Sequence, residues 1–154
     1  MEIERKFLIK SLPTDINSYP FHIIEQAYLC TDPVIRVRKE DDNYYMTYKG
    51  KGLMAREEYN LPLNRMAYEQ LKSKAEGNII TKKRVLIPYL KYTIELDLFA
   101  EPFAPLQLAE VEFESEEEAL AFTPPDWFGQ DVTNNPAYHN SNMAKSISLG
   151  SNSL

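Results

Sequence analysis

Apolar and charged residues alternate along several short segments of this chain, and this period of two constrains the fold more than any other feature. In the first segment Glu2, Glu4 and Lys6 share one side, while Ile3 and Phe7 lie on the other. Successive side chains of a β-strand point to opposite faces of a sheet, so the pattern predicts a mainly antiparallel β protein of about eight strands. The segments are residues 1–9, 23–29, 35–38, 44–49, 56–61, 82–87, 93–98 and 109–114.

The charged faces are too uniform for the wet side of an ordinary sheet. A solvated face mixes Thr, Ser, Gln and scattered Lys, whereas nearly every segment here offers two carboxylates or two cations at alternate positions. If the sheet closes into a barrel, these side chains converge in its lumen. Burying so many charges is costly unless water, metal ions and a polyanionic ligand compensate them. We therefore expect a closed eight-stranded barrel with a functional lumen.

Two stretches have helical spacing. Asn64 is a good N-cap for a helix that runs to about Ala75 and is closed by Gly77, with Met66 and Leu71 in its apolar stripe. A second helix is expected over residues 116–122, and a further turn over residues 141–145. We expect the helices to pack on the outside of the barrel.

Ser115 and Glu118 have the spacing of a capping box before the second helix, and Pro124 and Pro125 stop that helix. At 154 residues the chain is expected to form one domain over residues 1–146, followed by a frayed tail over residues 147–154.

Composition excludes several classes of protein. A net charge of -6 argues against a general nucleic-acid binder, and a single cysteine excludes an internal disulfide framework or a cysteine-rich zinc site. The charged N-terminus lacks the apolar core of a signal peptide, and no apolar run reaches the ~18 residues of a membrane span. We expect a cytoplasmic protein without a membrane or nucleic-acid partner. The outward-facing Tyr44 and Tyr48 lie either at a homodimer contact or beneath a helix.

Two carboxylate pairs indicate a cation site. Glu2 with Glu4, and Glu110 with Glu112, each place two oxygen donors on one face of a strand, about 6.6 Å apart. Neither of the two histidines has a metal-ligand spacing, so the pairs favour Mg²⁺ or Mn²⁺ over zinc.

Six cations on the inward faces are suited to phosphate. Arginine offers a fork that matches phosphate oxygens, and lysine adds a mobile point charge. Each alone is more often a solvated charge, but six on one side of neighbouring strands favour a polyanion site. The six are Arg36, Arg38, Lys49, Arg56, Lys82 and Arg84.

The motifs together resemble the CYTH family of triphosphate tunnel metalloenzymes, in a short form that consists of the catalytic domain. The resemblance covers most of the chain. It rests on Glu2-x-Glu4-x-Lys6, IEQAYL (residues 24–29), RVR (36–38), TYKG (47–50), REE (56–58), KKR (82–84), IELD (94–97) and AEVEFE (109–114). It implies a closed eight-stranded antiparallel tunnel, a divalent metal and a triphosphate substrate.

The resemblance also implies a role for each matching residue. Glu2, Glu4, Glu110 and Glu112 would hold metal, and Glu58, Glu95 and Asp97 would support a second metal or orient the cations and the attacking water. Lys6 would join the six cations above in binding phosphate. The implied catalytic residues are Glu2, Glu4, Lys6, Glu58, Glu110 and Glu112. A later stretch over residues 129–144 resembles a lid or positioning element, with Asp131 in place of an expected Glu.

Hydrolysis of the phosphoanhydride bond of inorganic tripolyphosphate is the first hypothesis, because the chain shows no additional aromatic cage or base-reading insertion. Tyr28, Tyr45 and Phe99 have inward parity, and they either stack on an organic group or pack at the tunnel mouth. Thiamine triphosphatase and class IV adenylate cyclase are the alternative enzymes. A non-catalytic sensor of polyphosphate or nucleotides is the alternative outside enzymology.

Overall fold

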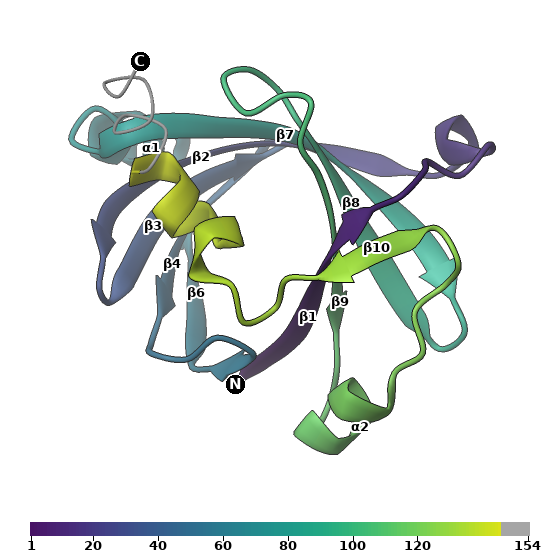
Figure 1. Cartoon of the computed structure of the whole chain (residues 1–154). Helices are drawn as coiled ribbons and strands as arrows, with labels where there is room; N and C mark the ends of the chain where they lie inside the picture. The colour runs from purple at the N-terminus through teal and green to yellow at the C-terminus, as the bar shows by residue number, and fades with distance from the viewer. Residues whose placement is uncertain (146–154) are drawn as a thin grey trace, which may run out of the picture.

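The computed structural model describes residues 1–145, and in this part of the chain ten strands form one antiparallel sheet (Figure 1). The strand order is β10-β1-β9-β8-β7-β2-β3-β4-β6, and the short β5 pairs with β1. The strands are β1 (Glu2–Ile9), β2 (Phe21–Thr31), β3 (Val34–Glu40), β4 (Asn43–Lys49), β5 (Ala55–Arg56), β6 (Glu58–Leu63), β7 (Glu76–Tyr89), β8 (Tyr92–Phe99), β9 (Gln107–Glu112) and β10 (Phe128–Asp131).

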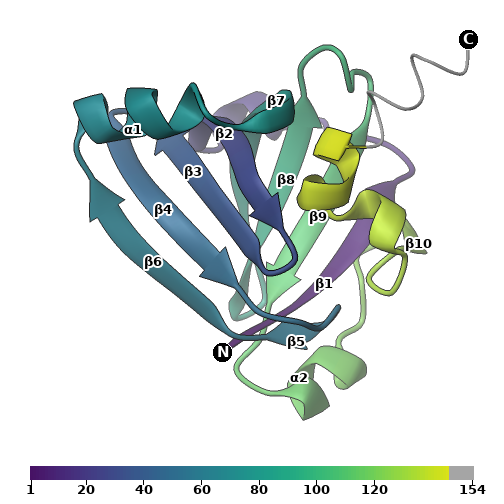
Figure 2. The ribbon, with the colours of Figure 1, turned by 90° about the vertical axis from the view of Figure 1, so that its left-hand side faces the viewer.

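The sheet curls until its two sides nearly meet (Figure 2). β5 and β6 are separated only by Glu57, and β5 pairs with the start of β1, where Arg56 lies opposite Glu2. This contact confirms the mainly β barrel. Ten strands replace the predicted eight for two reasons. Glu57 interrupts one predicted strand and its carbonyl accepts from the Gly50 amide, while β10 adds a strand beside the far end of β1.

The first helix follows its predicted start but not its predicted apolar stripe. α1 spans Arg65–Lys72, and the Asn64 side chain accepts a hydrogen bond from the Ala67 amide. The buried residue is Tyr68, whereas Met66 is 83% exposed. Residues two apart point about 200° away from each other around a helix, so burying Tyr68 turns Met66 outward. α1 covers the outer faces of β2, β3 and β4 (Figure 2).

Gly77 was expected to end α1 and instead lies within β7. The helix ends three residues before Ala75, at Lys72, with Ser73 as its C-cap. Gly77 has φ +77, and a Cβ at this position would meet the Ala144 carbonyl oxygen at 2.8 Å. The glycine therefore serves a close approach between β7 and the C-terminal segment.

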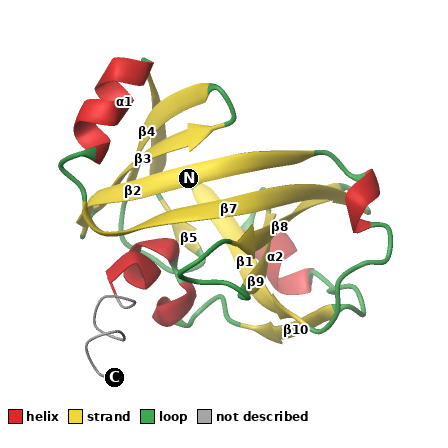
Figure 3. Ribbon diagram, turned by 90° about the horizontal axis from the view of Figure 1, so that it is seen from above, coloured by secondary structure: helices red, strands yellow, loops and turns green. Residues whose placement is uncertain are grey.

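The second helix, α2 (Glu116–Ala121), begins as predicted, because Ser115 Oγ accepts from the Glu118 amide. Phe122 follows it and joins an apolar cluster on the outside of β1, β7, β8 and β9, together with Phe7 and Phe128. α2 lies on the outside of the barrel, at the opposite side from α1 (Figure 3). Two short 3-10 helices, Ile16–Ser18 and Pro136–Tyr138, complete the fold.

The C-terminal segment, which we define as residues 132–145, crosses one end of the barrel (Figure 1). Residues 140–145 are helical, which confirms the predicted turn at 141–145. Val132 and Met143 pack against Tyr28 and Leu108. This apolar plug closes that end of the lumen. The tail predicted for residues 147–154 lies outside the described residues, and the single-domain boundary stays a prediction. No helix in residues 1–145 is long and apolar enough to span a bilayer.

Candidate active site

A cavity of about 710 Å³ occupies the lumen, and the predicted site residues meet there. Those that line it are Glu2, Glu4, Lys6, Arg36, Arg38, Lys49, Arg56, Glu58, Lys82, Arg84, Glu95, Glu110 and Glu112. Asp97 is the exception among the predicted residues. Its carboxylate lies behind Arg84 and Lys82 and is 1% exposed.

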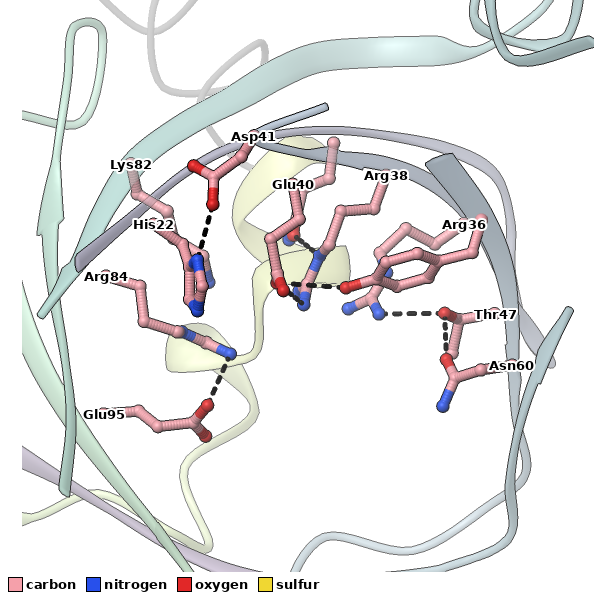
Figure 4. A network of polar contacts seen from close by, with 12 residues as sticks. His22, Arg36, Arg38, Glu40, Asp41, Thr47, Asn60, Lys82, Arg84 and Glu95 are labelled. Atoms are coloured by element: carbon pink, nitrogen blue, oxygen red, sulfur yellow. Dashed lines mark hydrogen bonds and ion pairs between the residues drawn. The ribbon is translucent and has the colours of Figure 1, made fainter. Parts of the chain in front are cut away.

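Opposite charges occupy opposite walls of the lumen. Four of the cations, Arg36, Arg38, Lys82 and Arg84, come from β3 and β7, and Figure 4 shows them pointing into the lumen. Glutamates dominate the wall made by β1, β8 and β9. On each strand only alternate side chains face the lumen. The order of the strands in the sheet therefore decides which of these charges lie side by side. Glu95 reaches across to Arg84 at the boundary.

The acidic wall contains carboxylates without cation partners. Glu4 lies opposite Glu112 in the β1–β9 register, and no Lys or Arg in residues 1–145 is within ion-pair distance of either carboxylate. Burial, together with Glu110 and Glu2, raises the pKa of Glu4 to about 7. Burial and the nearby Glu58 also raise the pKa of Glu112. This wall would therefore gain from a bound cation.

The basic wall contains arginines without carboxylates close by. Arg36 Nη2 donates to Thr47 Oγ1 at 3.0 Å, but Arg36 Nε is the one buried side-chain nitrogen or oxygen in the described part of the chain that lacks a partner. Burial and the neighbouring Arg38 lower the pKa of Arg36. Arg38 has only Glu40 nearby, at 3.9 Å. An unpaired guanidinium donor in a cavity fits an anionic ligand.

Asp97 binds two of the cations of the basic wall. Both of its oxygens accept from Arg84, at 2.8 and 2.9 Å, and Lys82 Nζ lies 2.8 Å from the same carboxylate. Burial opposes ionisation of Asp97, but Arg84 and Lys82 outweigh burial and lower its pKa. Of the two roles that the resemblance implies for Asp97, this geometry favours orienting the cations.

Two other lysines form ion pairs with the glutamates. Lys49 Nζ lies 3.0 Å from Glu2 and 3.3 Å from Glu58, and Lys6 Nζ lies 3.3 Å from Glu110. Burial raises the pKa of Glu110, but Lys6 and Arg84 outweigh it and hold that pKa well below its usual range.

Some site residues carried no role in the sequence reasoning. Gln26, Thr47 and Asn60 have the inward parity of the charged residues, and that parity was the available signal. Asn140 and Ser141 also line the cavity, but they come from the C-terminal segment, whose position no local pattern reveals. Tyr28 and Tyr45 line the cavity as expected, whereas Phe99 belongs to the apolar plug.

The donor chemistry fits a hard divalent cation. The unpaired groups on the acidic wall are carboxylates, and the buried His139 of the C-terminal segment has its Nε2 3.2 Å from the Thr133 carbonyl oxygen of the same segment. Within residues 1–145 no three metal-binding side chains already form a closed set. A cation here would therefore draw the glutamates together and share its coordination with ligand oxygens and water, as Mg²⁺ does in phosphate-binding sites.

Comparison with known proteins agrees with this geometry. The sequence pattern of the CYTH domain matches residues 1–131. An inorganic triphosphatase of Nitrosomonas europaea is 40% identical over 152 residues, covering 95% of this chain and 98% of that protein. An inorganic triphosphatase of Acetivibrio thermocellus is 34% identical, covering 94% and 93%. A crystal structure of an inorganic triphosphatase superposes with a TM-score of 0.70 at 36% identity, covering 94% of each chain.

Proposed function

The chain belongs to the CYTH domain family, and from this premise we propose that it hydrolyses a phosphoanhydride bond of a triphosphate, with inorganic tripolyphosphate as substrate. The observation that carries the proposal is the pair of unbalanced walls in one cavity. Within residues 1–145, Arg36 has no carboxylate within ion-pair distance and Arg38 has only Glu40, at 3.9 Å, while Glu4 and Glu112 have no Lys or Arg within that distance. A triphosphate together with a divalent cation satisfies both walls at once.

The basic wall would hold the triphosphate. Arg36 and Arg38 stand two residues apart on β3, so their guanidinium groups reach successive phosphates from one side. Arg84 is held by Asp97, which fixes the direction of its remaining donors. Bidentate arginine contacts orient phosphate oxygens as well as binding them.

The acidic wall would hold Mg²⁺ or Mn²⁺. We assign Glu2, Glu4, Glu110 and Glu112 to this role, with Glu58 and Glu95 as supporting carboxylates. When bound, such an ion neutralises phosphate oxygens and lowers the pKa of a water molecule. Phosphoryl transfer passes through a loose transition state, so the protein chiefly has to position the groups and neutralise charge. Lys6 and Lys49 would do so at the boundary of the two walls.

Two other activities use the same walls. A class IV adenylate cyclase would direct the ribose hydroxyl of ATP at the α-phosphate, and a thiamine triphosphatase would accept an organic group at the cavity mouth beside Tyr45. The relatives at 40% and 34% identity, both named inorganic triphosphatases, favour tripolyphosphate over either. A sensor without turnover is disfavoured by the unpaired glutamates, because carboxylates without metal weaken anion binding.

Product analysis separates these activities. Purified protein is incubated with tripolyphosphate, thiamine triphosphate or ATP, each with Mg²⁺ or Mn²⁺, and phosphate and nucleotide products are measured. Phosphate released fastest from tripolyphosphate supports the proposal. Cyclic AMP with pyrophosphate from ATP would replace it with the cyclase, and tight triphosphate binding without any product would replace it with the sensor.

A cytoplasmic location, the absence of a nucleic-acid partner and a homodimer also stay predictions. Tyr44 is half-buried, and its ring packs against Tyr68 of α1 with the ring centroids 5.2 Å apart. Tyr48 is exposed, with the Tyr59 ring centroid 6.0 Å away. If a dimer forms through the tyrosines, we expect Tyr48 to lie in it.

A further inference from the structure

We propose that Gln26 and Asn140 form a neutral carboxamide bridge that positions Arg38 and Lys82 for the triphosphate, an inference that rests on the proposed function. Gln26 is on β2, between the strands that carry the two cations, and its side chain is fully buried. Asn140 enters the cavity from the C-terminal segment.

Four hydrogen bonds define the bridge. Gln26 Oε1 accepts from Arg38 Nε at 2.8 Å, and Asn140 Oδ1 accepts from Lys82 Nζ at 2.8 Å. The two amides are joined directly, because Gln26 Nε2 donates to Asn140 Oδ1 at 3.1 Å. Gln26 Nε2 also donates to the Tyr28 hydroxyl at 2.8 Å. Each cation thus has one donor held by an amide oxygen.

The bridge has one orientation. A carboxamide has one accepting oxygen and one donating nitrogen, and both ends of Gln26 are engaged. Turning the amide over would place its NH₂ group against the Arg38 guanidinium, donor against donor. Arg38 is therefore held by a partner that cannot reorient without losing its bonds to both Arg38 and Asn140, whereas the Tyr28 hydroxyl can donate as well as accept.

The neutrality of the bridge distinguishes it from the carboxylate that holds Arg84. Asp97 positions Arg84 but also cancels positive charge. Amide oxygens accept from a cation without cancelling its charge, so the bond to Gln26 takes nothing from the attraction of Arg38 for phosphate. A glutamate at position 26 could accept the same bond from Arg38, but it would neutralise the arginine and could not donate to Asn140 Oδ1. This is a physical reason for glutamine among so many charged residues.

Asn140 makes the bridge depend on the C-terminal segment. The neighbouring residues of this segment pack into the plug at the end of the barrel, through Met143 and Ala144. Lys6 Nζ also donates to the Tyr138 carbonyl oxygen, at 3.2 Å. Two lysines of the cavity, Lys6 and Lys82, are therefore held in part by a segment outside the sheet. Asn140 and Gln26 are positioning residues, since they act through the cations.

The test compares isosteric variants by binding and by turnover. The variants are Gln26→Glu, Gln26→Met and Asn140→Asp, and the matched control is Gln70→Glu, which adds the same charge at an exposed position of α1, on the outside of the barrel. Calorimetry with Mg²⁺ measures Kd for the imido analogue of tripolyphosphate, in which NH replaces each bridging oxygen. Steady-state assays measure kcat and KM for tripolyphosphate.

We expect Gln26→Glu and Asn140→Asp to raise Kd and KM by about tenfold to a hundredfold, with a smaller change in kcat. Gln26→Met removes the bonds without adding charge and should raise Kd by about tenfold. Gln70→Glu should change Kd by less than about threefold. Melting temperatures should change little for Asn140→Asp, because Asn140 is only partly buried.

The inference is overturned if Gln26→Glu and Asn140→Asp both bind the analogue as the unmodified protein does, or if Gln70→Glu weakens binding as strongly. The two proposals fail separately. If the unmodified protein binds the analogue but releases no phosphate from tripolyphosphate, the proposed hydrolysis is refuted. The Kd values of the variants for the analogue then still test the bridge. An unmodified protein that does not bind the analogue refutes both.

Discussion

Glu4 of β1 and Glu112 of β9 stand directly opposite each other in the antiparallel register. Like charges in directly opposed positions destabilise a sheet, and Glu95 and Glu110 repeat the arrangement on β8 and β9. Nothing in the packing of the barrel requires these pairs. A cation bound at the acidic wall would explain them, because it would relieve the repulsion between the carboxylates. The metal-free protein would then be less stable than the metal-bound protein.

Removing one negative charge from this wall should abolish turnover and leave the fold intact. We expect Glu→Gln substitution at position 2, 4, 110 or 112 to reduce kcat for tripolyphosphate by at least about a hundredfold, because each replaces a carboxylate that we assign to the metal. Circular dichroism and thermal melting check the fold. Normal turnover in all four variants would refute the assignment of these glutamates.

The stability of the metal-free protein should fall as pH rises through neutrality. The pKa of Glu4 is about 7 in the fold and 4.5 ordinarily, so its contribution is complete below about pH 4.5 and is lost as pH rises through about 7. The loss has an upper bound of about 3 kcal/mol. Thermal melting in EDTA between about pH 4.5 and pH 8 measures it.

Two comparisons isolate Glu4 in that experiment. Glu4→Gln should remain flatter over the same pH range, and Mg²⁺ or Mn²⁺ should restore stability at the higher pH by favouring the ionised carboxylate. Parallel pH curves for the two proteins would show that Glu4 is not responsible.

Arg36 should contribute to substrate binding more than to stability. Its Nε has no partner, so Arg36→Lys removes a buried unsatisfied donor and should leave the melting temperature nearly unchanged, while KM rises by about tenfold. Arg5→Lys is the matched control. The Arg5 guanidinium donates to the carbonyl oxygens of Ala119 and Phe122, on the outside of the barrel.

Arg5→Lys is expected to lower the free energy of unfolding by about 1–2 kcal/mol and to leave KM unchanged. Steady-state kinetics and urea unfolding of both variants provide the comparison. An Arg36→Lys variant that lost stability but kept its KM would place Arg36 in the framework of the barrel.

Tyr68 should hold α1 on the barrel. Its side chain is fully buried and its hydroxyl donates to a Glu25 carboxylate oxygen at 2.6 Å. Tyr68→Ala should cost about 3–5 kcal/mol of unfolding free energy through the cavity that it leaves. Met66→Ala, on the same helix but exposed, should change that free energy by less than about 0.5 kcal/mol.

Denaturant unfolding measures both variants, and tripolyphosphate turnover well below the melting temperature should be near normal in each. Equal losses from the two substitutions would mean that α1 packs through a different face.

Alternation was enough to predict which side chains share the lumen. Glu2, Glu4 and Lys6 lie on one face because the period of a strand is two in any sheet, and the same reasoning placed Arg36 and Arg38. The mainly β barrel followed from those faces and the resemblance. Helical starts were also predictable, because the Asn64 and Ser115 caps are local hydrogen bonds.

Features that depend on distant partners were predicted less well. Met66 fits the apolar spacing of a helix, but the face that packs on β2–β4 is the one that carries Tyr68. The strand β10 was missed because its pairing with β1 joins residues more than a hundred positions apart, such as Phe7 and Asp131.

The sequence by itself determined the chemistry of the cavity, because strand parity and residue type are local properties of the chain. Only the tertiary structure decided which charges are balanced. Asp97 and Glu110 end beside cations, whereas in residues 1–145 Glu4 has no cation and Arg36 no carboxylate within ion-pair distance, and Gln26 meets Asn140 across 114 positions. Ion pairing depends on register and on barrel closure, and neither is encoded within a single strand.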